Sequence, residues 1–425
     1  MKLPIRLLSF AALLGAGLSG RTALATQPLS AFMERAAGQS FDSRESAATF
    51  RQREAESDAA LGRLLPAFSA RGVYTRNQYE AGFGGNIFQK KNVLDAFLQL
   101  DVPIVDLANY HRYKSQQALT RAANESQAVT TQDVGRGVSR AYFQFIGASA
   151  LARSARLSVG SSEENLKNVQ ARRAAGVATD LDLERATANV ERARQDVADA
   201  ELAADLAARA LETLSGLSPT PSEDFPADDL HEEAPLASWE AQASNSPQGR
   251  AARSAEEAAR EGQKAAARAL LPTLSANAQQ HFGNSAGITG HATFYTLQLV
   301  AAVRLDYTTM STSRAQGTAA EIQGIRAERT QRAVADATFE AFRRVQAGIV
   351  KSRSARAQAA AARRAAELAA DRYGAGAATQ LDVTQAQRDA FLADASRIQA
   401  DADLALSRVQ LRLAVGQGLT PGRNP

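Results

Sequence analysis

The sequence predicts a mainly α-helical subunit with a smaller β-barrel portion, built from one structural unit used twice. Three observations predict this fold class. The chain repeats itself, long segments place small and apolar side chains at coiled-coil spacing, and two pairs of segments alternate apolar with polar side chains. The composition agrees, because aromatic residues make up only 6% of the chain and alanine and arginine are abundant.

Composition also excludes several classes of protein. With 425 residues, 45% hydrophobic and 22% charged, the chain can bury a sizeable core and is neither disordered nor a small disulfide scaffold. There is no cysteine, so disulfides, thiolate metal sites and cysteine nucleophiles are excluded. The 49 basic and 45 acidic residues are spread along the chain and give a net charge of only +4, so we expect no nucleic-acid partner.

Residues 1–25 have the pattern of a secretory signal peptide. Lys2 and Arg6 precede an apolar run at 7–18, and Ala23-Leu24-Ala25 forms a small-x-small cleavage site, so the mature chain is expected to begin at Thr26. The alternative, an uncleaved anchor, would need to span about 30 Å of hydrocarbon, and the run is too short for that. No later stretch is apolar enough for a spanning helix, so we expect any membrane crossing to use β-strands.

The mature chain divides into two copies of one unit, at 26–216 and 240–416. The heptapeptide that starts at Gly176 recurs 200 residues later at Gly376, and Leu64-Leu65-Pro66 recurs as Leu270-Leu271-Pro272. Between the copies, residues 217–239 are rich in proline and predict an irregular equatorial linker. Residues 417–425 form a C-terminal tail.

Each unit is expected to hold one β-hairpin, at about 67–105 and 273–305. In the first hairpin the even positions from Phe68 to Tyr74 and from Leu94 to Ile104 are mainly apolar, and polar residues alternate with them. The tip between Asn77 and Asn92 is expected to be a loop. Two hairpins supply four strands, which cannot close a barrel that spans a membrane. The sequence therefore predicts an obligate oligomer that contributes four strands per subunit.

A long helical hairpin follows each β-hairpin, with tips near 176–182 and 376–382. The stretches 106–176 and 306–376 would each reach roughly 105 Å as helix, at 1.5 Å per residue. The returning segment 181–216 carries apolar or small residues at a 4-3 spacing, which predicts a coiled-coil seam. We expect bends or interruptions near Gly135, Gly137 and Gly160, because glycine lowers helix propensity.

With these features, the chain resembles the TolC family of outer-membrane efflux proteins over nearly all of its mature length. The most family-like motifs are the tip sequence that runs from Arg372 to Val383 and the strand-to-helix junction at Val102-Pro103-Ile104-Val105-Asp106. The resemblance implies a homotrimer with a shared twelve-stranded transmembrane β-barrel and a long coiled-coil α-helical barrel in the periplasm. It also implies an equatorial domain at the waist.

The same resemblance implies function and partners. The protein would be the outer-membrane channel of a tripartite efflux pump or type I secretion system. It would sit in the lipid of the Gram-negative outer membrane and bind a periplasmic adaptor (membrane fusion) protein and an inner-membrane transporter. Drugs, metal ions, polysaccharide and unfolded protein all use ducts of this shape, and specificity usually lies in the transporter. The alternative is a periplasmic coiled-coil adaptor, which would use the hairpins as a soluble β-domain.

The resemblance also implies that acidic residues ring the constriction at the periplasmic end. Asp182 and Asp382 occupy matching sites after the tip glycines, and Asp180 lies close by. Together they could attract cations into the channel constriction. The open alternative is that these carboxylates cap the helices that follow each tip. Gly176 and Gly376 are expected to end a helix in the left-handed conformation.

Four further residues at the tips form a possible latch. Arg172, Arg173 and Arg372 could pair with the acids across subunits, or could be solvated surface arginines. Tyr373 could hold the tip shut through a hydrogen bond to a neighbouring helix, or could be buried in a helix seam. Arg173 stands where the family has an aromatic residue opposite Tyr373, so a symmetrical aromatic latch is not expected.

No motif predicts an enzyme, a metal site or a cofactor. The four histidines are not in a His-Glu-x-x-His arrangement, and the chain has no nucleophile elbow or phosphate-binding glycine loop. His231-Glu232-Glu233 is a weak metal motif without a second cluster, so we do not predict a metal there. Asp106 and Asp306 are expected to cap the long helices.

Overall fold

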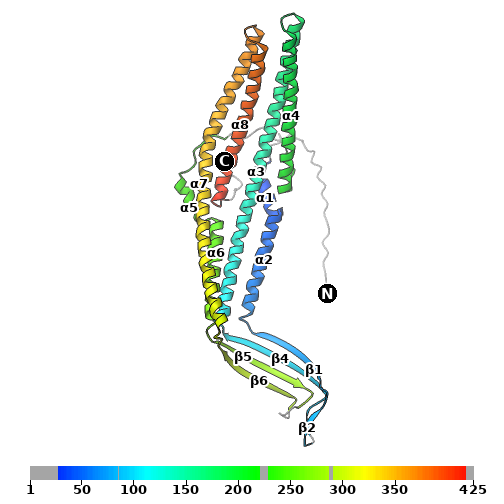
Figure 1. Ribbon diagram of the computed structural model, residues 1–425, viewed down its shortest axis with the longest axis vertical. Coiled ribbons are helices and arrows are strands. Elements are labelled where there is room, and N and C mark those ends of the chain that lie inside the picture. The colour runs from blue at the N-terminus through cyan, green and yellow to red at the C-terminus, as the bar shows by residue number, and fades with distance from the viewer. Residues whose placement is uncertain (1–26, 85, 221–227, 287–290, 418–425) are drawn as a thin grey trace, which may run out of the picture.

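The computed structural model describes residues 27–84, 86–220, 228–286 and 291–417. Apart from two short strands in the first copy, its described elements follow one order twice (Figure 1). The predicted signal peptide at 1–25, Thr26 and all but the first residue of the tail at 417–425 lie outside these ranges. The first copy contains α1 (Leu29–Gln39), α2 (Phe41–Gly62), β1 (Ala67–Arg76), β2 (Ala81–Phe83), β3 (Asn86–Gln89), β4 (Asn92–Val105), α3 (Leu107–Ala174) and α4 (Asp180–Ser215). The second copy contains α5 (Leu236–Ala243), α6 (Pro247–Arg268), β5 (Thr273–Gly283), β6 (Thr293–Ala302), α7 (Tyr307–Gly374) and α8 (Gln380–Ala414).

The four long strands form one antiparallel sheet in the order β1-β4-β5-β6, at the opposite end of the molecule from the helical tips (Figure 1). The pairing of β4 with β5 joins the two copies. Because side chains alternate across a sheet, the register fixes two faces. One cross-strand row is wholly apolar, Phe68, Leu100, Ala278 and Leu297, and the next is wholly polar, Ser69, Gln99, Gln279 and Thr296. The two-faced hairpins predicted from the sequence are present.

Two expectations about these segments were wrong in detail. The tip of the first hairpin is not only a loop, because β2 and β3 pair there as a second, short antiparallel ribbon. The expected interruption of α3 is also absent, because the helix is continuous through Gly135, Gly137 and Gly160. Gly135 lies where α3 faces Met33 of α1. A Cβ there would lie 2.7 Å from Cε of Met33, so the missing side chain makes room for α1 against α3.

The helices α3 and α7 each contain 68 residues, which corresponds to about 100 Å of helix. Both start where a strand ends. The Asp106 carboxylate accepts a hydrogen bond from the Asn109 backbone N–H at 2.8 Å, and Asp306 accepts one from Thr309 at 2.7 Å, which confirms both predicted caps. Each then packs against the returning helix of its copy, α3 on α4 and α7 on α8. Among the described helices, none combines the length and the hydropathy that a membrane-spanning helix requires.

The main hydrophobic cores lie midway along the helices. The first gathers Phe32 from α1 and Tyr142 from α3 around Leu211, and it includes Val409 from the second copy. The second places Trp239 of α5 against α7 and α8. Burial in the first core raises the pKa of the Tyr142 hydroxyl to about 12. The short helices α1 and α5 therefore play the same part, since each adds a buried aromatic side chain to a long helical hairpin.

Candidate functional site at the hairpin tips

Each helical hairpin turns at a glycine whose backbone conformation only a residue without a Cβ adopts easily. Gly176 has φ of +73° and Gly376 has φ of +75°, which is the left-handed region predicted for both. The backbone N–H of Val177 then donates to the carbonyl of Arg172 at 2.9 Å, and that of Ala377 donates to Arg372 at 2.7 Å. These bonds satisfy carbonyls at the end of α3 and α7 and fix the direction of the turn.

Replacing Gly176 with Ala is expected to destabilise the tip by about 1–2 kcal/mol, the cost of placing an L-residue in the left-handed region. Nothing lies within 4 Å of the added Cβ, so the effect is conformational and not a clash. The matched control is Gly374→Ala, where the space is also open but φ is not positive. Hydrogen exchange at the tip amides should be about 5- to 30-fold faster in Gly176→Ala and unchanged in the control. Equal exchange in both variants would contradict the strain.

The predicted acids Asp182 and Asp382 close identical capping boxes at the start of α4 and α8. The Thr179 hydroxyl accepts a hydrogen bond from the Asp182 N–H at 3.2 Å, and the Asp182 carboxylate accepts one from the Thr179 N–H at 3.1 Å. In the second copy, Thr379 and Asp382 make the same pair at 3.3 and 2.8 Å. The capping alternative that the sequence left open is therefore confirmed as the local role of both residues.

These caps keep both acids charged. Hydrogen bonds from the Thr179 side chain and backbone hold the pKa of the Asp182 carboxyl below its usual range, and those from Thr379 do the same for Asp382. Arg185 and Arg372 add a smaller electrostatic contribution in the same direction. Since a lowered pKa favours the anion, each tip carries a fixed negative charge at neutral pH, and the charge is compatible with capping.

The arginines at the tip make contacts within one chain. The guanidinium of Arg172 donates to the backbone carbonyl of Tyr373 at 2.5 Å and stacks over the Tyr373 ring, with 4.6 Å from its carbon to the ring centroid. Arg172 thus joins the tip of the first hairpin to that of the second. Its neighbour Arg173 pairs with Asp180 at 2.6 Å, inside the first hairpin, and both side chains are largely exposed. For Arg372 the structure shows an electrostatic influence on Asp382.

Tyr373 is half-buried beneath this arginine. Burial raises the pKa of its hydroxyl, the Arg172 charge lowers it, and the raising effect is larger. The contact therefore involves a neutral tyrosine ring, whose face attracts a cation. Of the predicted latch residues, the structure brings together Arg172 with Tyr373 and Arg173 with Asp180.

Sequence reasoning missed an ionic clamp at the equator, which we define as Arg408, Asp228, His231 and Glu233. The Arg408 side chain is fully buried, and it contacts both Asp228 oxygens at 2.6 and 3.0 Å and Glu233 Oε1 at 2.5 Å. It also donates to the His231 carbonyl at 2.8 Å. The hydrogen bonds with Asp228 and Glu233 outweigh burial and raise the pKa of Arg408, so it stays charged. The clamp attaches the segment before α5 to α8.

The same clamp explains a group of metal-type ligands. Asp228, Asp229 and His231 have ligand atoms within 4.8 Å of one another. However, both oxygens of Asp228 accept hydrogen bonds from Arg408, and His231 Nε2 lies 3.0 Å from Nη1 of the same guanidinium. Arg408 therefore engages two of the three residues, Asp228 and His231, and Asp229 contacts His231 Nδ1 instead.

The chain joins a sheet with one apolar face to helical hairpins of about 100 Å. It is similar in fold to the CmeC outer membrane channel of Campylobacter jejuni, with a TM-score of 0.80 at 16% identity over 99% of this chain and 96% of that chain. For the open state of the MtrE outer membrane channel of Neisseria gonorrhoeae, the TM-score is 0.78 at 20% identity, over 93% of this chain and 90% of that chain. For the solved structure of CusC, the TM-score is 0.81 at 16% identity, over 96% of this chain and 95% of that chain. No curated protein matches the sequence.

The sequence model of the outer membrane efflux protein family matches residues 32–217 and 240–417, one segment for each copy. The chain belongs to the outer membrane efflux protein family. The resemblance inferred from the repeat and the tip motif is confirmed, and with it the function of an outer-membrane exit duct for efflux.

Proposed function

We propose that three copies of this chain form one passive duct through the outer membrane, with twelve strands in a shared barrel and the helical hairpins in the periplasm of a Gram-negative cell. The observation that carries this proposal is the sheet. Its outer strands, β1 and β6, each pair on one side only among the described residues. Its apolar face is open, with Leu297 71% exposed. Joining β1 of one subunit to β6 of the next would satisfy both edges and turn the apolar face to lipid.

We further propose that the partners are a periplasmic adaptor and an inner-membrane transporter, which meet the duct at its hairpin tips. The tips lie at the far end of the molecule from the sheet (Figure 1). They are also where the two hairpins of a subunit make a polar contact that can be broken, between Arg172 and Tyr373. The function is conduction, not catalysis.

The first test of this proposal is the native mass of the detergent-extracted protein from the outer-membrane fraction, followed by reconstitution in planar bilayers. We expect a trimer that needs detergent to stay in solution and that forms discrete conductance steps. A soluble monomer released with the periplasm would refute the shared barrel. In that case the hairpins would have to serve as the β-domain of a coiled-coil adaptor.

The capping boxes allow the charge of the tip acids to be separated from their structural role. Asp182→Asn with Asp382→Asn keeps an oxygen that can accept from Thr179 and Thr379 but removes both charges. The Ala pair removes charge and cap together, at a typical cost of about 1 kcal/mol per cap. If the acids ring the constriction, both pairs should lose cation selectivity in bilayers. If only the Ala pair changes the channel, the acids act as caps alone.

The same acids predict how selectivity depends on pH. Both folded pKa values lie below the unfolded value of about 3.9, so the charges and the caps are fully present above that pH. They are lost only as pH falls through the folded pKa. We expect cation selectivity in bilayers to be constant from pH 7 to about 5 and to fall below about 4. A loss of selectivity between pH 7 and 5 would assign it to other groups.

A further inference from the structure

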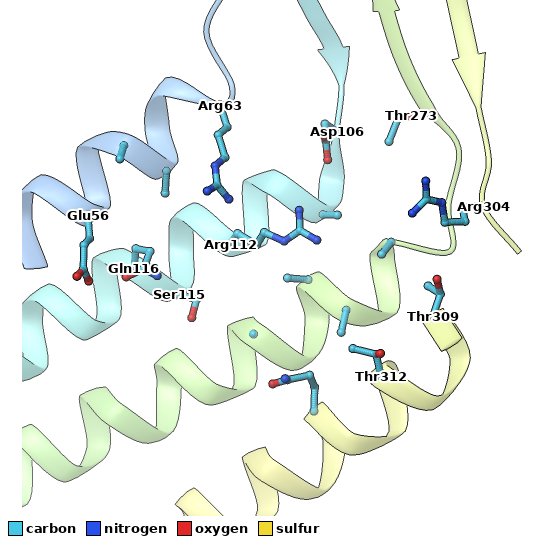
Figure 2. Close-up of a pocket in the computed structure, with 18 of the residues that line it drawn as sticks. Glu56, Arg63, Asp106, Arg112, Ser115, Gln116, Thr273, Arg304, Thr309 and Thr312 are labelled. Carbon is cyan, nitrogen blue, oxygen red and sulfur yellow. The ribbon is translucent and has the colours of Figure 1, made fainter. Parts of the chain in front are cut away.

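A hollow of about 770 Å³ lies where the helices meet the sheet, and neither the fold nor the conduction path accounts for its lining. Four helices and the start of β5 surround it (Figure 2). Its floor includes small residues of α2, α3 and α6, and its rim includes three arginines: Arg63 at the end of α2, Arg112 on α3, and Arg304 just before α7. A hollow of this volume suits a drug-sized molecule.

The register of the sheet decides which way the hollow faces. Thr273 lines it, and along β5 this residue shares a face with Ser275, Asn277 and Gln279. That is the polar face. The apolar face, which we assign to lipid, carries Leu274, Ala276 and Ala278 instead. The hollow therefore opens on the side that becomes the lumen in the proposed duct.

Three arginines and two acids line the hollow, so its lining carries a formal charge of +1. The guanidinium groups of Arg63, Arg112 and Arg304 come from three elements and extend over the same space (Figure 2). Among the described residues, the Arg63 side chain has no hydrogen bond or ion pair. Arg112 donates to the Asn109 side chain at 2.7 Å, and Arg304 interacts electrostatically with the Asp306 carboxylate. Two helix N-termini and two helix C-termini meet here, so their dipoles largely cancel and the side chains set the potential.

The acids that line the hollow are already engaged. Asp106 accepts hydrogen bonds from the Asn109 backbone and side chain at 2.8 and 2.7 Å, and Glu56 pairs with Arg53 at 2.7 Å. The N-cap Asp306 stands nearby on α7, and its carboxylate accepts from Thr309. The Thr312 hydroxyl adds an uncharged donor, whereas the Thr273 hydroxyl donates to the Ala302 carbonyl at 3.3 Å and the Thr309 side chain hydrogen-bonds Asp306. Guanidinium and hydroxyl donors above an apolar floor fit an anion that carries an apolar body.

We propose that this hollow is a binding site for small organic anions, such as carboxylates, sulfonates or phosphate esters, on the lumen wall just below the barrel. The placement in the lumen rests on the proposed function. In a trimer three such sites would surround the path, and each would hold an anionic solute transiently as it leaves the periplasm. A lipid phosphate has the same charge chemistry, but it would have to reach the hollow from the polar face of the sheet.

The test measures binding of fluorescein, an organic dianion, to the full-length protein in neutral detergent by fluorescence anisotropy. We expect Arg63→Gln with Arg304→Gln to weaken binding by about tenfold or more, which corresponds to losing about 1.4 kcal/mol. The control pair, Arg51→Gln with Arg329→Gln, removes the same charge from exposed positions on α2 and α7 outside the hollow and should bind as the unsubstituted protein does. Equal affinities for both pairs would overturn the proposal.

Two further arms separate the remaining outcomes. Displacement of fluorescein by phosphatidylglycerol in the micelles, but not by phosphatidylcholine, would assign the hollow to lipid headgroups and overturn the solute site. Channel formation is measured on the same preparations in planar bilayers. If the unsubstituted protein forms no channel, the proposed function fails. If it forms channels but the two variant pairs bind fluorescein equally, only the site fails.

Discussion

Replacing Arg408 with Ala is expected to destabilise the equatorial region by about 3–5 kcal/mol, among the largest effects of a single substitution in this chain. The side chain is fully buried, and its removal would leave the carboxylates of Asp228 and Glu233, each 9% exposed, without their cation. Arg408→Lys should recover part of the loss, because an ammonium keeps the charge but cannot bind both Asp228 oxygens in a fork.

Hydrogen exchange in the segment 228–243 and the thermal unfolding midpoint measure this loss. The matched control is Arg388→Ala, which removes an exposed arginine from the same helix, α8, and should change neither quantity. If Arg408→Ala and Arg388→Ala have the same unfolding midpoint and the same hydrogen exchange in the segment 228–243, the clamp contributes nothing to stability.

Replacing Arg172 with Ala is expected to separate the two hairpin tips of a subunit. The substitution removes a charge-assisted hydrogen bond to the Tyr373 carbonyl and a cation–π contact with the Tyr373 ring. Together these contribute about 1–2 kcal/mol at a half-buried site, so the population with separated tips should rise roughly 5- to 30-fold. In planar bilayers we expect higher mean conductance at the same voltage.

The neighbouring residue supplies the control for this experiment. Arg173 carries the same charge at the same tip, but its ion pair with Asp180 stays within the first hairpin and is exposed. Such a pair contributes little, about 0–1 kcal/mol, so Arg173→Ala should leave conductance nearly unchanged. An equal rise in both variants would show that the tip responds to net charge and not to the contact between hairpins.

Most of the fold could be predicted because the sequence repeats and because its apolar residues recur at regular spacing. The alternation from Phe68 to Tyr74 predicted a two-faced strand, and the copies of the tip around Gly176 and Gly376 predicted two equal helical hairpins. At the tip the repeat also marked Asp182 and Asp382, but spacing alone could not separate a cap from a channel ring. That choice depends on the position of Thr179 and Thr379, one helical turn earlier.

The clamp could not be predicted in this way, since it joins Arg408 to residues 175 to 180 positions earlier in a segment that does not repeat. One signal was present. The position 200 residues before Arg408 is Ala208, so a charged residue replaces a small one on the matching face of the helix. The ion pair of Arg356 with Asp401 differs in this respect, because Arg156 and Glu201 pair at the matching positions of the first copy. The first-copy pair is exposed, whereas in the second copy the Asp401 side chain is only 2% exposed.

The difference between the two tips has a consequence for symmetry. The first tip carries Arg173 and Asp180 where the second carries Tyr373 and Gln380, although both turn on the same glycine geometry. In a trimer the periplasmic end would present six hairpins of two alternating kinds. A protein that contacts the Arg173–Asp180 pair would find three equivalent sites, and one that contacts only the turn itself would find six. The number of partner molecules bound per trimer would then show which of these two features the partner recognises.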